Sequence, residues 1–221
     1  MALRLTRWKL GATALALVAV SPFVAPEVLA FPHSAVVGED RVWSEVPLPD
    51  DRIEAILSDA NSRVAQSPLA EGKEGRRIFL TDGGWRWRLL SLQSRMAYGL
   101  TRPLREDIIL NRSDVAKGVV YGGLGDGRTR QIAGVIAHEK CHGMMRRRLG
   151  ILGENAKPVW LKEGYCDYVA QETTLSANDV ASLEARGESH PALPYYRGYQ
   201  KVDRILRANG GDVDSLLDLK D

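Results

Sequence analysis

Apolar side chains recur at helical spacing in several stretches of the chain, and these stretches predict its main helices. The first helix is expected to start at Asp50 or Asp51, which can cap it, and to bury one stripe: Ile53, Ile56, Leu57, Ala60 and Val64. A second stripe ends near residues 98–99 and comprises Trp85, Leu89, Leu92 and Met96. Short apolar runs over residues 76–81, 107–111 and 118–121 predict strands.

The second half of the chain has a mainly helical pattern. Helices are predicted over residues 129–149, from residue 159 onward, over residues 176–187, around residues 202–206 and over residues 212–219. Gly150 suits the position just after the first of these, and Ser176 with Asp179 has the spacing of a capping box. The pattern therefore predicts an α+β fold, with a small mixed sheet followed by a long helix and a mainly helical C-terminal part.

Some segments show neither the helical nor the strand pattern of apolar residues. Residues 31–49 are expected to form an extended lead, and residues 72–75 a loop. Residues 122–127 are rich in glycine but lack the Lys-Ser/Thr ending of a phosphate-binding loop, so they predict a turn. Arg146, Arg147 and Arg148 fall in the last turn of the long helix, where cations oppose the helix dipole, and are expected to form a solvated helix end.

Composition fits a globular protein, since 44% of the 221 residues are hydrophobic and 26% are charged. Residues 1–30 resemble an export signal: basic residues precede an apolar run over residues 10–20, and small residues before position 31 suit cleavage after Ala30. Removing that segment takes 30 basic and 28 acidic residues to 27 of each, which excludes a nucleic-acid signature. An uncleaved anchor is the alternative, although the apolar run is shorter than the roughly 20 residues of a membrane span.

Potential metal ligands and acid–base groups are most concentrated in the sequence His-Glu-Lys-Cys-His over residues 138–142. On a helix, His138 and His142 share one face and can offer imidazole nitrogens to one metal ion. Glu139 lies about 100° further round, where its carboxylate can reach a water held by the metal. A catalytic zinc site takes three protein ligands and leaves the fourth position to water, and Glu163 is the candidate third ligand.

His-Glu-x-x-His followed by Trp-Leu-x-Glu-Gly resembles the gluzincin metallopeptidases, the group that contains thermolysin and the membrane-alanyl-type aminopeptidases. In those aminopeptidases the third ligand lies in Trp-Leu-x-Glu-Gly-Phe-Ala-x-Tyr; this chain has Trp-Leu-Lys-Glu-Gly-Tyr-Cys-Asp-Tyr over residues 160–168, so Glu163 matches the ligand. The resemblance covers residues 129–211. It implies one zinc ion per chain and a zincin-like catalytic domain over residues 76–221, preceded by a lead and helix over residues 31–75.

The resemblance also implies three supporting roles. Asp167, four residues after the ligand glutamate, matches an aspartate that hydrogen-bonds a metal-bound histidine; an exposed or capping carboxylate is the alternative. Tyr195 matches the oxyanion-binding tyrosine of a Tyr-x-Lys-Gly segment, with Arg197 in place of the lysine. Tyr196, Tyr199 or a purely structural tyrosine are the alternatives. Residues 119–121 are the expected edge strand that holds the substrate backbone.

Other features of the sequence bear on the site less directly. Trp85 and Trp87 could line a substrate groove, although core packing or surface cover is the favoured interpretation. Cys141 and Cys166 each lie beside a metal ligand, and export would place them in an oxidising compartment, so we hypothesise a disulfide that braces the site. Two buried free thiols are the alternative.

Together these features predict an exported, zinc-dependent metallohydrolase that acts on a peptide or protein substrate. An endopeptidase is the default by elimination, because the Gly-x-Met-x-Asn segment with which the aminopeptidases recognise a free amine is missing. A catalytically inactive zincin-like scaffold and a zinc hydrolase of a non-peptide amide or ester are the alternatives. No nucleic-acid partner is expected, membrane contact requires an uncleaved N-terminal segment, and the oligomeric state is left open.

Overall fold

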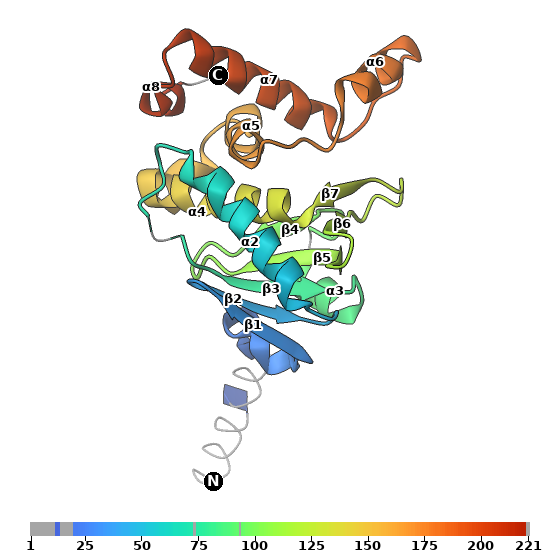
Figure 1. Cartoon of the computed structure of the whole chain (residues 1–221). Helices are drawn as coiled ribbons and strands as arrows, with labels where there is room; N and C mark the ends of the chain where they lie inside the picture. Colours follow the sequence, from blue (N-terminus) through green and yellow to red (C-terminus); the bar gives the residue numbers. More distant parts are fainter. Residues whose placement is uncertain (1–11, 14–19, 73, 93, 220–221) are drawn as a thin grey trace, which may run out of the picture.

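The computed structural model describes residues 12–13, 20–72, 74–92 and 94–219. It has a mixed α+β architecture in which α2 and α4 cover one face of a sheet and further helices stack beyond α4 (Figure 1). This confirms the predicted class and the small mixed sheet.

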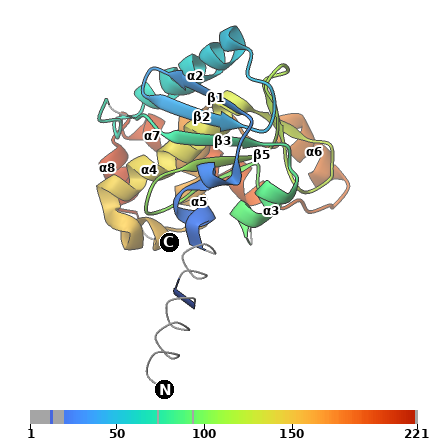
Figure 2. The same ribbon diagram turned by 90° about the horizontal axis from the view of Figure 1, so that it is seen from below.

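The sheet has seven strands, in the order β1-β2-β3-β5-β6-β7, with β4 paired to β5 off this path. Their bounds are β1 His33–Val37, β2 Asp40–Ser44, β3 Arg77–Thr81, β4 Gly99–Thr101, β5 Ile108–Asp114, β6 Val119–Tyr121 and β7 Thr129–Gln131. The β2–β3 and β3–β5 pairs are parallel, whereas the other pairs are antiparallel. Strands β1, β2, β3 and β5 lie side by side in Figure 2.

The helical elements are η1 Pro26–Leu29, α2 Asp50–Ala65, α3 Trp85–Ser91, α4 Ile132–Asn155, α5 Val159–Ala170, α6 Ala177–Ala185, α7 Leu193–Ala208 and α8 Val213–Leu217. Helix α2 forms the crossover that a parallel β2–β3 pair requires. Its buried residues are the predicted stripe, of which Ile53, Ile56, Leu57 and Ala60 pack with the sheet and the start of α4 into one core, while Val64 packs into a second core. The predicted capping box of α6 is present.

The predicted lead over residues 31–49 is wrong, because this segment contributes the β1–β2 hairpin to the sheet. Gly38 makes the turn with a positive φ of 58°. Strand β2 could not be predicted from the pattern of apolar residues because two of its buried residues, Asp40 and Ser44, are polar. Since β2 pairs with β3, the sheet also spans the predicted boundary at residue 75.

The opposite face of the sheet is covered by α3 and by residues near η1 (Figure 2). The stripe predicted for α3 is wrong. Trp87 and Leu90 are its buried apolar side chains, and the helix ends at Ser91 because Leu92 adopts a φ of 50°. Trp85 is 56% exposed under the guanidinium of Arg86, so one tryptophan belongs to the core and the other to the surface, as favoured.

Beyond α4, a second core joins α4, α5, α7 and α8. Helices α5 and α7 cross with their backbones in close contact at Gly164 and Gly198. A Cβ at Gly164 would lie 2.4 Å from the carbonyl carbon of Gly198, and one at Gly198 would lie 2.5 Å from the carbonyl oxygen of Trp160. These two glycines therefore permit the crossing that sets the start of α7 beside α5.

The predicted export segment falls largely outside the described residues. Its described part contacts the sheet side of the molecule, where Glu27 forms an ion pair with Arg77 at 2.8 Å and Arg86 donates to the carbonyl of Leu29 at 2.9 Å. Phe31 packs on Phe79, with 5.4 Å between ring centroids. Within the described residues, no helix has the length and apolar character needed to cross a membrane.

Candidate metal centre

Three predicted ligands meet where α4 and α5 pack together. His138 and His142 lie one turn apart on α4, and Glu163 faces them from α5. Oε2 of Glu163 is 3.3 Å from Nε2 of His138 and 3.6 Å from Nε2 of His142. One ligand atom from each residue lies within 4.8 Å of the others, so the cluster could hold a metal ion.

Each histidine is oriented through its other ring nitrogen. Nδ1 of His138 lies 2.8 Å from Oδ1 of Asp167, and Nδ1 of His142 lies 2.9 Å from Oε1 of Glu154. A carboxylate at Nδ1 holds the proton there and leaves Nε2, the nitrogen that faces Glu163, free to bind a metal. Asp167 thus makes the histidine contact expected of it, whereas Glu154 was not predicted.

Glu154 reaches His142 because of a break in α4. Gly150 adopts φ 75° and ψ 162°, so the regular helix stops there, as predicted, but a further helical stretch continues to Asn155. That stretch returns Glu154 to the metal side of the helix. The only signal in the sequence was Gly150, which indicates a left-handed turn but not the path of the chain beyond that turn.

The charges of the centre suit a cation. Burial would raise the pKa of Glu163, but hydrogen bonds from Nε2 of His138 and His142, whose protons a bound metal would displace, outweigh it and hold that pKa far below its usual range. Burial would also raise the pKa of Asp167, yet the charges of Arg130 and His138 lower it. Two imidazoles and one ionised carboxylate are donors that Zn²⁺ accepts.

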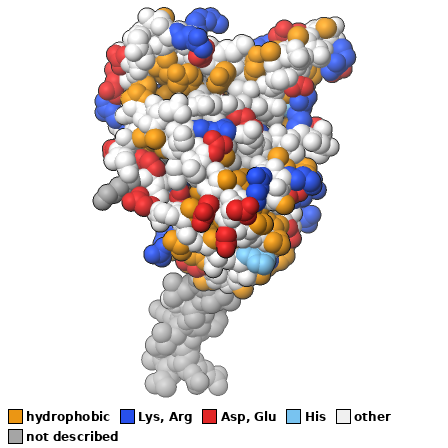
Figure 3. Space-filling view, in the orientation of Figure 1, with side chains coloured by type: hydrophobic (Ala, Val, Ile, Leu, Met, Phe, Trp, Pro, Cys, Tyr) orange, Lys and Arg blue, Asp and Glu red, His pale blue; other side chains and the backbone are white. Residues whose placement is uncertain are grey.

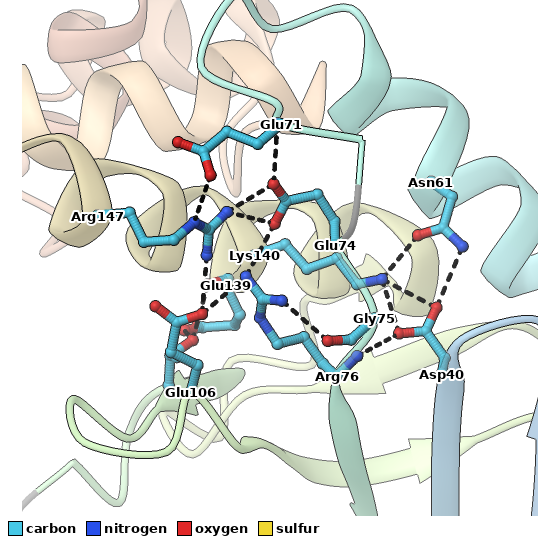
Figure 4. Close-up of polar contacts among 11 residues, drawn as sticks. Asp40, Asn61, Glu71, Glu74, Gly75, Arg76, Glu106, Glu139, Lys140 and Arg147 are labelled. Atoms are coloured by element: carbon cyan, nitrogen blue, oxygen red, sulfur yellow. Dashed lines mark hydrogen bonds and ion pairs between the residues drawn. The ribbon is translucent and has the colours of Figure 1, made fainter.

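Glu139 and Lys140, adjacent in sequence, serve opposite sides of α4. The hydroxyl of Thr101 donates to Oε2 of Glu139 at 2.7 Å, and Glu139 lines a cleft over the candidate ligands. Lys140 is fully buried and reaches away from the metal centre, donating to both oxygens of Asp40 at 2.8 and 2.9 Å and to Asn61 at 2.6 Å (Figure 4).

The same back side of α4 also holds Arg147. Its guanidinium contacts Glu74 and, at 2.9 Å, Glu106, while Arg76 reaches the same two acids at 2.8 and 2.7 Å (Figure 4). The expectation that all three arginines form a solvated helix end is wrong for Arg146, which is only 8% exposed. Arg148 fits it, with an exposed ion pair to Asp214 at 2.8 Å.

The cleft that opens over the candidate ligands has a volume of about 650 Å³. Strand β4 forms one wall, and the start of α7 closes the side that carries Tyr195. The expected edge strand at residues 119–121 is wrong, because β6 pairs with β5 on one side and β7 on the other. In the described part of the chain β4 pairs only with β5, so β4 is the strand with a free edge at the site.

The backbone of β4 presents hydrogen-bonding groups to that free edge. Asn111 donates to the carbonyl of Tyr98 at 2.8 Å, and Arg102 donates to that of Asp107 at 2.9 Å, which sets the alternation of the β4–β5 ladder. In an antiparallel pair every second residue then points its N–H and C=O away from the partner. In β4 these residues are Gly99 and Thr101.

Of the three candidate tyrosines, only Tyr195 lines the cleft. Burial, followed by the charges of Glu163 and Asp167, raises the pKa of Tyr195, so its hydroxyl keeps its proton at neutral pH. Tyr196 packs against the core of α6 and accepts a hydrogen bond from Gln200, whereas Tyr199 packs against Tyr168.

Cys141 and Cys166 are buried free thiols, so the hypothesised disulfide is absent from this structure. Both belong to the core shared by α4 and α5, where Sγ of Cys166 lies 3.8 Å from Sδ of Met145. The two thiols also interact with each other, and Cys166 interacts with His142, so they correspond to the alternative of two free thiols.

The surface seen in Figure 3 carries basic and acidic side chains interspersed with one another. No family model matches the chain, and neither a curated protein nor a solved structure matches it. The case for a metal centre therefore rests on the geometry of His138, His142 and Glu163.

Proposed function

We propose that this protein is a zinc-dependent hydrolase of peptide bonds with a zincin-like catalytic domain. The observation that carries the proposal is the convergence of His138, His142 and Glu163, with Glu139 beside them, at the floor of a cleft edged by a free strand. A structural zinc site has no need of an additional carboxylate such as Glu139 in an open cleft. The same arrangement thereby favours an enzyme over a scaffold.

The residues fit the proposed metal. Both imidazoles have Nδ1 engaged by a carboxylate and Nε2 directed toward Glu163, which is the arrangement of donors that a zinc ion needs. When bound, zinc would lower the pKa of a water ligand toward neutrality and polarise the scissile carbonyl.

The roles of the chain's own residues follow from their positions. Glu139 would accept the proton of the attacking water and later give it to the leaving amine, while Thr101 orients its carboxylate. Tyr195, with its proton retained, would donate a hydrogen bond to the oxyanion. The backbones of Gly99 and Thr101 would hold an extended peptide by strand addition, which gives affinity without selecting side chains.

Metal content tests the proposal. We expect about one zinc per chain in the purified protein, as for any single site with three protein ligands. His142→Ala should lose the zinc and the hydrolysis of an unbiased peptide library, whereas His33→Ala, which changes an exposed histidine of β1, should retain both. A well-folded wild-type protein that takes up no zinc on incubation with the metal would overturn the proposal.

A further inference from the structure

We propose that Arg146 and Lys162 form a subsite for a carboxylate of the substrate at one end of the cleft. This inference deepens the proposed function, on which it rests, and names a chemical class for the peptide that the cleft would take. Both residues line the cleft, Arg146 from α4 and Lys162 from α5. Arg146 follows His142 by four residues, so both side chains lie on the same face of the helix, one turn apart.

Arg146 is buried without a full set of partners. Its side chain is 7% exposed, and its nearest carboxylate is that of Glu154, at 3.7 Å from Nη1. Nε and Nη2 are buried and have no hydrogen-bond partner among the described residues. Guanidinium N–H groups left unpaired in a protein interior are costly, so their placement beside a cleft points to an external acceptor.

Lys162 adds a second cation, 20% exposed, to this end of the cleft. Its ammonium makes no hydrogen bond to any described residue and lies 4.0 Å from Oε1 of Glu163. Glu163 is committed to the metal, and Glu154 already accepts from His142 and faces Arg146. Each of the two cations therefore has one nearby carboxylate, and both of these carboxylates are also engaged with the histidines.

The other buried arginine of the cleft shows the contrast. Arg130 lies 3.0 Å from Asp167 and 3.6 Å from Glu172, so one cation faces two acids. Acids thus outnumber the cation at the Arg130 end, whereas the Arg146 end has no more than one acid for each cation. An anionic group of the substrate would add an acceptor at the Arg146 end.

A carboxylate is the anion that a peptide carries, and its two oxygens match the fork of a guanidinium. It can come from a free C-terminus or from an aspartate or glutamate side chain. The first source would make the enzyme trim peptide ends, whereas the second would make it cut beside acidic residues.

Binding to the full chain with Glu139→Gln, loaded with zinc, tests the subsite without cleavage of the probe. Four N-acetylated pentaalanine peptides serve as probes: one with a free C-terminus, one with a C-terminal amide, and two amides with glutamate or glutamine at one position. We expect one carboxylate peptide to bind at least about tenfold more tightly than its uncharged match in isothermal titration, as for hydrogen bonds to charged groups. Whichever pair shows the preference identifies the source.

Substitution then assigns the preference to the two cations. Arg146→Gln and Lys162→Gln should each remove most of it, while Arg148→Gln, an exposed neighbour on α4, should leave it intact. Zinc content is measured for each variant. If Arg146→Gln fails to fold, the result for Lys162→Gln is the test of the subsite. Equal binding of all four peptides, or a preference that survives both substitutions because the carboxylate binds the metal, would overturn the subsite. Hydrolysis of neutral peptides would continue in that case, so this failure is distinct from failure of the proposed function.

Discussion

The two sides of α4 both bury positive charge, but they treat it differently. On the back side, the buried ammonium of Lys140 contacts both oxygens of Asp40 and also Asn61, while Arg147, which is exposed, meets Glu74 and Glu106 (Figure 4). On the metal side, His138 and His142 present Nε2 only to Glu163, and Arg146 keeps two unpaired N–H sites. The difference teaches that burial of charge does not by itself mark a binding site.

A binding site is marked instead by charged or hydrogen-bonding groups that the protein itself leaves unpaired. A buried ion pair whose members satisfy each other contributes to the uniqueness of the fold and has nothing left for a ligand. A donor that the fold buries and leaves unpaired has a cost that a bound group or an ordered water can offset. The comparison therefore predicts loss of chemistry from changes on one side and loss of stability from changes on the other.

The largest effect is expected from Glu139→Gln on the metal side. The amide cannot accept the proton of the attacking water, so peptide hydrolysis should fall about 10³-fold or more, while zinc content stays at the wild-type level. Steady-state kinetics and metal analysis measure the two quantities. Glu184→Gln, at an exposed glutamate of α6, is the matched control. Turnover close to wild type in Glu139→Gln would remove the proposed general base.

On the back side, Lys140→Met should destabilise the fold. The change leaves the buried carboxylate of Asp40 without its cation, which typically costs about 3–5 kcal/mol, measurable as the free energy of unfolding in urea. Combining it with Asp40→Leu should recover most of the loss, because no buried charge is then unpaired. Lys117→Met, at an exposed ion pair that water screens, should cost far less than the buried change. Equal losses at the buried and exposed lysines would contradict the comparison.

Glu154→Gln sharpens the comparison within the metal side. The amide is a weaker partner for Nδ1 of His142, so zinc affinity should fall about 10–100-fold, with little change in the unfolding of the metal-free protein. Competition with a coloured chelator gives the affinity. Glu188→Gln changes an exposed glutamate and should have no effect. Unchanged zinc affinity in Glu154→Gln would mean that the contact does not orient the ligand.

The smallest effect is expected from Arg148→Gln, which lies on neither side. Its ion pair with Asp214 is largely exposed, so the free energy of unfolding should change by no more than about 0.5 kcal/mol. Urea unfolding and zinc analysis of this variant set the baseline for its neighbours. A larger loss would show that α8 depends on this contact.

Much of the architecture was predictable because burial follows periodicity in α2. The hairpin formed by β1 and β2 was not, since strand periodicity is hidden where Asp40 and Ser44 take the buried positions. The order of the strands also lay beyond the sequence. A short apolar run such as β6 has the same appearance whether it lies inside the sheet or at its edge, and β4, which reads Gly-Leu-Thr, has too few apolar residues to be predicted as a strand.

The residues of the candidate site also divide into those that the sequence predicts and those that it does not. His138, His142 and Glu163 were predictable from spacing, and the structure brings them together. Glu154 was not, because its contact depends on how the chain leaves Gly150. Arg146 was predictable in principle, since it continues the face of His142 by one turn, but the run of three arginines suggested a single common environment.

The contact between Lys140 and Asp40 also bears on whether the part of the chain that carries the candidate site can fold by itself. It joins positions 100 residues apart, and it ties the helix that carries two of the candidate metal ligands to a strand that precedes α2. A fragment of residues 76–221 would keep every proposed ligand of the metal, yet it would lose Asp40 and Asn61, the acceptors of the Lys140 ammonium, together with the helix and strands that pack against α4. We expect such a fragment to lack the cooperative thermal transition of the whole chain, as circular dichroism would reveal. The metal centre is therefore not a portable unit: transplanting it requires the N-terminal hairpin as well.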